Sequence, residues 1–160
     1  MDLKRMHPLL PATTATEYGH RAGIGLERHR HAPGVVLSTR FDREKGSAHL
    51  HWTSPPPGGA EQLDRHRITE DAAEAIALAL VHGVRGWVVR RRLQRGESAD
   101  WLLHDPEARL VALEISGVGE EDDSQRLRRK LEQVRTATVA RQRVACVVEL
   151  RHPRATVATA

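Results

Sequence analysis

Two apolar segments with one acid in each mark residues 96–117 of the sequence. The first, residues 99–103, is short and is followed by a His-Asp-Pro sequence. The second, residues 110–115, is a nearly continuous apolar run, as is typical of a strand buried on both faces. Asp105 and Pro106 between them favour a tight turn, because proline fixes its own φ and aspartate can accept hydrogen bonds from the backbone ahead of it. This stretch therefore predicts two neighbouring strands joined by a turn.

Each predicted strand carries one acid among apolar neighbours, Asp100 in the first and Glu114 in the second. Burying a carboxylate is costly unless a metal, a cation or a hydrogen bond offsets the loss of water. Two interpretations follow. Asp100 caps a turn and Glu114 bonds one of the many arginines, or the two acids share one functional site.

The composition limits the kind of protein and its partners. A chain of 160 residues makes one ordinary domain, and the net charge of +4 rests on arginine, which suits phosphate recognition but is also abundant in proteins from GC-rich genomes. One cysteine, Cys146, excludes intrachain disulfides and Cys-based zinc sites, and its apolar neighbours predict an inert core thiol. With no apolar segment of membrane-spanning length, we expect a soluble cytoplasmic protein with no membrane partner.

The sequence divides into three predicted parts. Residues 1–54 form an N-terminal arm and a β-hairpin, residues 55–64 a Pro/Gly-rich linker, and residues 65–160 an α/β core. Residues 1–33 show no clear periodicity, so they form either a loose arm or an arm that is ordered only against a protein partner.

A β-hairpin outside the core is predicted by strands over residues 35–41 and 47–52. Two His-x-His pairs occur, and His49 and His51 would share one face of a strand, as metal ligands often do. Because no third ligand is evident nearby, solvent-facing histidines are the favoured interpretation over a metal site.

Thr69 is suited to cap a helix over residues 70–82. Apolar residues cover most of the circumference of that helix, which predicts that it is largely buried. Glu70 and Glu74 lie at the edge of its apolar stripe, one turn apart. A strand over residues 87–89 follows.

Four arginines follow that strand, and they form either a phosphate-facing patch or a solvated strand end: Arg90, Arg91, Arg92 and Arg95.

A second helix is predicted over residues 124–140, with Leu127, Leu131 and Val134 on one face. Acids at residues 120–123 precede it and complement its dipole. A closing strand over residues 144–150 follows, and the Ala/Thr/Val tail after it gives no strong signal.

From Glu70 onward, the order helix, three strands, helix and strand resembles the core of the restriction-endonuclease-like PD-(D/E)xK superfamily. Ala99-Asp100 stands where that family has Pro-Asp, and Glu114-Ile115-Ser116 stands where it has (D/E)-x-K. In the family, the two acids bind a divalent metal and a further acid often comes from the first helix, which here corresponds to Glu74. The motifs are short and degenerate, and the family lysine is replaced by Ser116, which is neutral and can only hydrogen-bond.

The resemblance implies an α/β fold with a small mixed sheet flanked by helices, and Mg²⁺ or Mn²⁺ bound by Glu74, Asp100 and Glu114. A catalytic lysine supplied from the second helix would be Lys130, the only lysine beyond residue 45, although it is also placed to cover Leu127 and Leu131 with its aliphatic stem. Phosphodiester hydrolysis would then rest on Asp100, Glu114 and Lys130.

Two functions remain open at this stage. One is a metal-dependent nuclease that binds DNA through the four arginines that follow residue 89. The other is a degenerate nuclease fold that acts as a protein-interaction or assembly subunit, with contacts through its N-terminal part. The retained acids favour the first, and Ser116 favours the second. A homo-oligomer is compatible with either.

Overall fold

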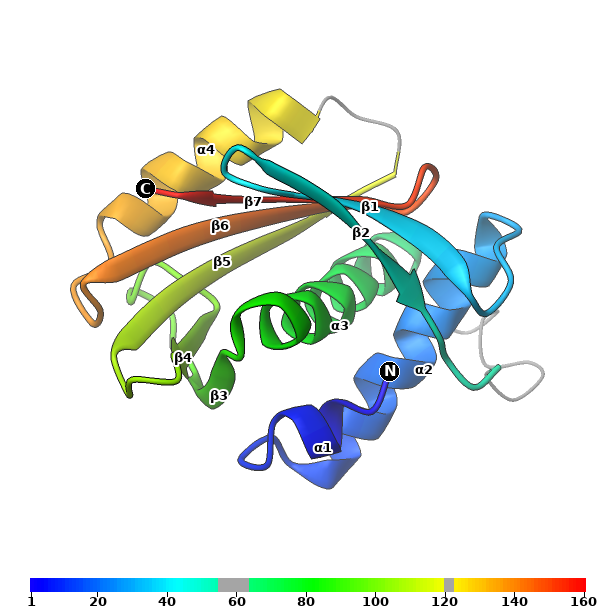
Figure 1. The fold of residues 1–160 in the computed structure, drawn as a ribbon, viewed down its shortest axis with the longest axis horizontal. Coiled ribbons are helices and arrows are strands. Elements are labelled where there is room, and N and C mark those ends of the chain that lie inside the picture. Colours follow the sequence, from blue (N-terminus) through cyan, green and yellow to red (C-terminus); the bar gives the residue numbers. More distant parts are fainter. Residues whose placement is uncertain (55–63, 120–122) are drawn as a thin grey trace.

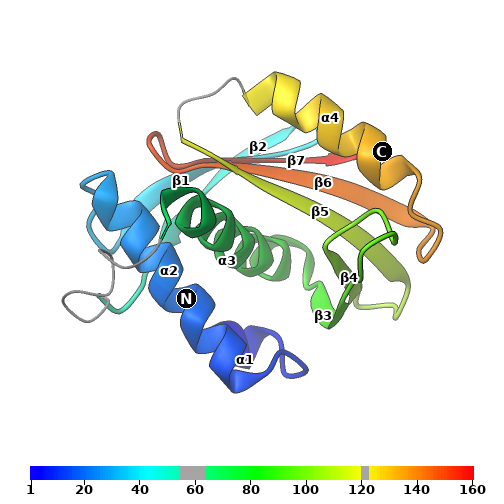
Figure 2. The same cartoon turned by 180° about the vertical axis from the view of Figure 1, so that it is seen from behind.

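The computed structural model describes residues 1–54, 64–119 and 123–160 as one seven-stranded mixed β-sheet with helices on both faces (Figure 1). The helices are α1 (Leu3–Met6), α2 (Ala12–Arg28), α3 (Arg65–Arg85) and α4 (Asp123–Arg135). The strands are β1 (Val35–Phe41), β2 (Glu44–Leu50), β3 (Val88–Arg92), β4 (Trp101–His104), β5 (Leu110–Val118), β6 (Gln142–Glu149) and β7 (Arg154–Thr159). Seen from behind, α1, α2 and α3 lie on one face of the sheet and α4 lies on the other (Figure 2).

The half of the sheet that follows α3 has the predicted order of elements. Strands β3, β4 and β5 form an antiparallel meander, and β6 returns through α4 to pair parallel with β5. The prediction that the four apolar segments belong to one sheet flanked by two helices is confirmed. Burial follows the sequence pattern as well, because all of β5 after Leu110 is buried, as its continuous apolar run predicted.

The prediction of a β-hairpin outside the core is wrong. Strands β1 and β2 do pair antiparallel, but β1 also pairs in parallel with β7, so the strand order is β2-β1-β7-β6-β5-β4-β3. The tail that forms β7 gave no strand signal because it is short and rich in alanine and threonine. That strand connects the hairpin to the rest of the sheet, and the sheet is therefore larger than expected.

The expectation of a loose N-terminal arm over residues 1–33 is also wrong. Leu3, Leu10 and Leu26 are each 1% exposed or less, and they pack in the same core as α3. His7 is fully buried, with Nε2 3.2 Å from the carbonyl oxygen of Leu78 and Nδ1 accepting from the N–H of Val89. These contacts come from α3 and β3, which are distant in the chain, so local periodicity did not predict them.

Helix α3 is longer than its predicted span of residues 70–82. The side chain of Asp64 caps it by accepting from the N–H of Arg67, while Thr69 lies one turn inside and donates its hydroxyl to the carbonyl of Arg65. The helix ends at Gly86, whose left-handed φ of 67° suits glycine. The predicted linker lies outside the described residues except for Asp64.

Helix α4 ends at Arg135, before the predicted end at residue 140. Beyond it, buried Ala137 and Ala140 continue the packing against the sheet without helical structure. The acids at residues 120–122 lie outside the described residues. Among the helices that the structure describes, none has the length and apolar composition needed to cross a membrane.

Candidate functional site

Asp100 lies where β4 and β5 separate. The first residue of β4, Trp101, pairs with Leu113, whereas β5 continues to Val118 beyond the end of its partner. The N–H of Asp100 donates to the carbonyl of Leu113 at 3.1 Å, and its Oδ2 accepts from the N–H of Ile115 at 2.8 Å. Asp100 thus closes the β4–β5 ladder with its own carboxylate and is held beside the next residue of β5, Glu114.

Glu114 points from β5 toward α4. The residues on either side of it, Leu113 and Ile115, pack in the core on the α3 face, and side chains alternate along a strand, so Glu114 and Ser116 face α4. Each of these two residues is 1% exposed. Because β5 lies beneath α4 along this stretch, a residue of α4 can reach the Glu114 carboxylate.

Lys130 of α4 donates to Oε1 of Glu114 at 2.5 Å. The other carboxylate oxygen, Oε2, is buried and has no hydrogen-bond partner among the described residues. Burial, followed by the negative charge of Asp100, raises the pKa of Glu114 to about 7, although Lys130 acts in the opposite direction. Near neutral pH this carboxyl is therefore poised between its two protonation states.

Glu70 joins this electrostatic environment from α3. Burial raises its pKa, the charge of Asp100 adds to the rise, and the charges of Lys130 and Arg126 oppose it. The close approach of α3 to β5 explains this placement, because a Cβ on Gly117 would lie 2.4 Å from the carbonyl oxygen of Thr69. The sequence placed Glu70 at the edge of the apolar stripe but gave it no role.

Glu74, the predicted third metal ligand, has a different set of neighbours. Its carboxylate accepts from the Tyr18 hydroxyl at 2.8 Å, from Nε1 of Trp101 at 2.9 Å, and from the two Arg92 amino groups at 3.0 and 3.1 Å. Burial raises its pKa, and Arg92 and Tyr18 partly offset that effect. Both oxygens of Glu74 thus have protein donors, although it lies near enough to Asp100 for the two charges to interact.

The arginines after residue 89 do not form one patch. Successive side chains of a strand alternate between its two faces, so Arg91 and Arg92 point to opposite faces of β3, and the register shift between Val89 and Arg91 leaves Arg90 without a partner on β4. Arg91 forms a bidentate ion pair with Glu97, with hydrogen bonds of 2.7 and 2.9 Å, and Arg92 forms an ion pair with Glu74. Arg90 and Arg95 are exposed. A nucleic-acid-binding role for the four arginines stays a prediction.

His49 and His51 are exposed, at β2 and directly after it, with ring centroids 6.5 Å apart, whereas His29 and His31 are partly buried at the end of α2. Within residues 1–54, 64–119 and 123–160, no group of three or more His, Cys, Asp or Glu side chains is arranged to hold a metal ion. At the fork between β4 and β5, the available donors are the carboxylates of Asp100 and Glu114, with Glu70 near them.

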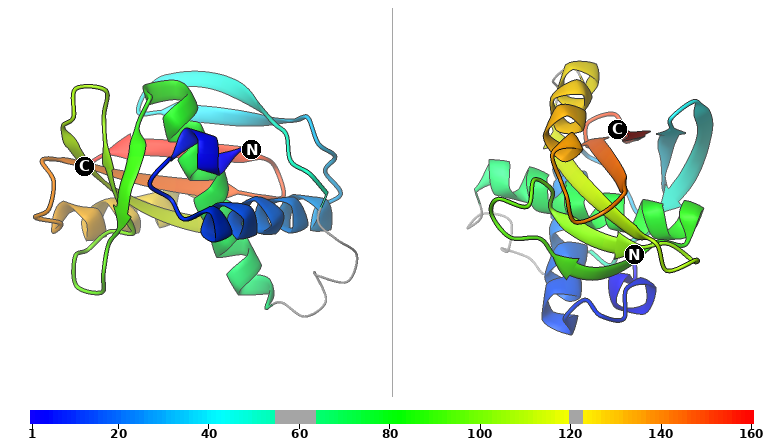
Figure 3. Two further views of the ribbon diagram at one scale, coloured as in Figure 1. Left: turned by 90° about the horizontal axis from the view of Figure 1, so that it is seen from below. Right: turned by 90° about the vertical axis from the view of Figure 1, so that its left-hand side faces the viewer.

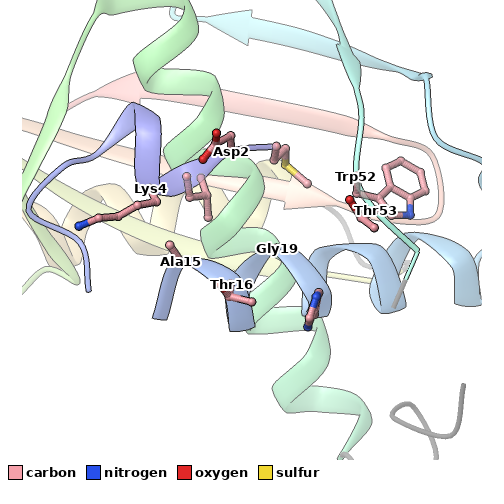
Figure 4. Close-up of a pocket in the computed structure, with 10 residues that line it drawn as sticks. Asp2, Lys4, Ala15, Thr16, Gly19, Trp52 and Thr53 are labelled. Carbon is pink, nitrogen blue, oxygen red and sulfur yellow. The ribbon is translucent and has the colours of Figure 1, made fainter. Parts of the chain in front are cut away.

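A pocket of about 360 Å³ lies elsewhere, between α1, α2 and the chain after β2 (Figure 4). Trp52 borders it and donates its Nε1 to Glu27 at 3.0 Å, and Lys4 donates to the carbonyls of Pro8 and Leu10. These contacts hold α1, α2 and the chain after β2 in place, so we interpret this pocket as a gap between packed segments.

Comparisons with protein-family models, curated proteins and solved structures find no match for this chain. The β4–β5 fork, where Asp100, Glu114 and Lys130 meet, is the candidate functional site.

Proposed function

We propose that this chain has a restriction-endonuclease-like core and hydrolyses phosphodiester bonds in DNA with a divalent metal. The observation that carries the proposal is the meeting of Asp100, Glu114 and Lys130, which come from the start of β4, the middle of β5 and α4. The succession of α3, β3, β4, β5, α4 and β6, with β6 parallel to β5, supports it, because it is the order implied by the resemblance.

Lys130 supplies the positive charge that Ser116 lacks. Ser116 lies two residues after Glu114 on the same face of β5, which is the position of the family lysine. The ammonium group of Lys130 reaches that face from α4 and contacts Glu114 directly. An ammonium group at this point can hold a water molecule or stabilise charge on a phosphate, so the role of the missing lysine has moved to another element.

The donors at the fork suit a hard divalent cation. Mg²⁺ is commonly held by one or two carboxylates and keeps several waters. Here two carboxylates converge, and Oε2 of Glu114 is buried with no donor from the residues that the structure describes. Asp100 and Glu114 would hold the ion, with Glu70 able to contribute. The ion would supply Lewis-acid chemistry by polarising a phosphate oxygen and making a water molecule more acidic. Glu70, whose pKa is raised by burial, is placed to accept a proton.

Cleavage of plasmid DNA tests this proposal. Wild-type protein should nick supercoiled DNA with Mg²⁺ or Mn²⁺ and should be inactive with a chelator. Asp100→Asn and Glu114→Gln should each lower the rate by at least about 100-fold. The matched control is Glu132→Gln, which neutralises an exposed acid on α4 two residues from Lys130 and should retain full activity. Equal cleavage by Glu114→Gln and wild type would refute the site.

Metal-dependent stability gives a second readout that does not require turnover. A ligand that binds only the folded state raises the melting temperature, so Mn²⁺ should stabilise the wild type, and Asp100→Ala should abolish that rise. If the wild type neither cleaves DNA nor responds to metal, the interaction-subunit function becomes the better explanation. Its structural support is that Ser116 cannot carry a charge and that Lys130 already neutralises Glu114.

A further inference from the structure

The α4 face of the sheet is only partly covered. Helix α4 packs over β5, β6 and β7, and none of the helices that the structure describes packs over β1 and β2 to a similar extent on that side. The right-hand view of Figure 3 shows α4 and the β1–β2 hairpin on either side of β6 and β7. A groove of about 450 Å³ lies there, lined by Ser38, Thr39, Arg40, Lys45, Gly46, Ser124, Arg154 and Thr156.

The strand register gathers cations in this groove. On β1, Leu37 and Phe41 are buried in the core on the α3 face, so Ser38 and Arg40 point to the α4 face. Arg40 lies directly opposite Lys45 of β2. Like charges directly opposite on antiparallel strands destabilise the pair, so this arrangement calls for an anion between them.

Hydroxyl groups lie next to these cations. Arg40 is aligned with Thr156 of β7, and Ser38 is aligned with Arg154. The described residues that line the groove include three cations, four serine or threonine residues, and no acid. Guanidinium, ammonium and hydroxyl groups together are the donors that bind phosphate oxygens.

The acids near the hairpin have other partners. Glu44 pairs with Arg85 of α3 at 2.8 Å, which places its charge on the opposite face of the sheet. Asp42 accepts from the N–H and the hydroxyl of Thr159 at 2.8 and 3.1 Å. Glu149 pairs with Arg154 at 2.6 Å, so Arg154 is partly neutralised while Arg40 and Lys45 carry the positive charge of the groove.

We propose that this groove binds backbone phosphates of DNA at a site separate from the β4–β5 fork, with Arg40 and Lys45 as the phosphate contacts. The inference rests on the proposed function for the identity of its ligand, since it gives the nuclease a second contact with its substrate. The contact reads no bases, because every donor suits phosphate oxygens, and binding is therefore independent of sequence and weakened by salt.

Binding of a short DNA duplex, followed by fluorescence anisotropy across a salt titration in the presence of a chelator, tests the groove. Arg40→Gln combined with Lys45→Gln should weaken binding roughly tenfold at low salt and reduce the slope of log affinity against log salt by about 2, one for each lost phosphate contact. The matched control, Arg5→Gln combined with Arg141→Gln, removes the same charge from exposed positions outside the groove and should change the slope little.

An equal loss of affinity in both double variants would overturn the proposal, because net charge and not the groove would then set the binding. Unchanged binding in the groove variant would overturn it as well. The two proposals fail separately: a groove variant that loses affinity while wild type shows no metal-dependent cleavage supports the groove and refutes the nuclease. Cleavage that requires Glu114, with DNA affinity indifferent to Arg40 and Lys45, does the reverse.

Discussion

The two buried glutamates Glu74 and Glu114 have opposite hydrogen-bonding environments. Glu74 on α3 receives four hydrogen bonds from three side chains, and both of its oxygens are used. Glu114 on β5 receives one, from Lys130, and its second oxygen is buried with no partner among the described residues. A buried carboxylate whose two oxygens both accept hydrogen bonds stabilises the residues around it. A buried carboxylate with an unused oxygen can still bind a ligand such as a metal ion.

The difference arises from the elements that converge on each acid. Trp101, Arg92 and Tyr18 come from β4, β3 and α2, and the edge-on contact between the rings of Tyr18 and Trp101 packs the network further. Arg92 also lies over the Trp101 ring, 5.2 Å from its centroid. Around Glu114, within the part of the chain that the structure describes, the side-chain cation that donates to the carboxylate comes from α4. The Glu74 network therefore connects the N-terminal helices to the core, and the Glu114 cluster is the candidate reactive site.

Neutralising the two glutamates in turn should separate stability from activity. Glu74→Gln places an amide against donors and leaves Arg92 without its carboxylate, so it should destabilise the fold by about 3 kcal/mol and lower the melting temperature by roughly 6–12 °C. Cleavage per folded molecule should persist. Glu114→Gln should lower metal-free stability by less than Glu74→Gln does, because the Lys130 ammonium group is partly exposed and water can solvate it, and it should abolish cleavage. Urea unfolding with parallel nicking assays measures both, and the reverse pattern would exchange the roles of the two acids.

The pH dependence of stability should distinguish Glu114 from other acids. Its pKa is raised from 4.5 in the unfolded chain to about 7 in the fold, so the folded state binds the proton more tightly. The stability contributed by Glu114 is therefore full below its unfolded pKa and is lost as pH rises toward 7. The unfolding free energy of the wild type, minus that of Glu114→Gln, should fall over this window in the absence of metal. A difference that does not vary with pH would show that Glu114 is ionised throughout.

Removal of one hydroxyl should give the smallest effect. Tyr18→Phe deletes the hydrogen bond to Glu74 and the contact with Arg92, and should cost about 1 kcal/mol. Combined with Glu74→Gln, its cost should shrink, because its acceptor is already altered. Chemical denaturation of both single variants and the double variant gives the coupling. Strictly additive costs would mean that the Tyr18 hydroxyl contributes to stability independently of the Glu74 carboxylate.

Much of the candidate site was predictable because its signals are local. Asp100 and Glu114 stood out as acids in apolar strands, and strand alternation put Ser116 on the same face as Glu114. Lys130 was a candidate because of its rarity and its place beside an apolar stripe. The turn at Asp105 was also correct, since its carboxylate accepts from the N–H groups of Glu107 and Arg109.

The errors concern contacts between distant segments. Arg91 and Arg92 bind different acids, Glu97 and Glu74, and a run of arginines does not show which acids the fold brings near each of them. Strand β7 is a weak segment by composition and becomes a central strand only because β1 and β6 flank it. The N-terminal helices likewise gain their stability from α3 and β3, to which His7 is hydrogen-bonded.

The sequence by itself determined the order of strands and helices from α3 to β6 and the acids that mark the fork, because hydrophobic periodicity and the cost of burying charge act along the chain. Only the tertiary structure decided that both carboxylate oxygens of Glu74 accept hydrogen bonds, whereas Oε2 of Glu114 has no partner among the described residues. Glu70 and Glu74 lie one turn apart on the same helix, yet Glu74 meets Tyr18, Arg92 and Trp101 while Glu70 faces Asp100 and Lys130. That choice depends on how α3 packs against β5 at Gly117, a contact between residues far apart in the sequence.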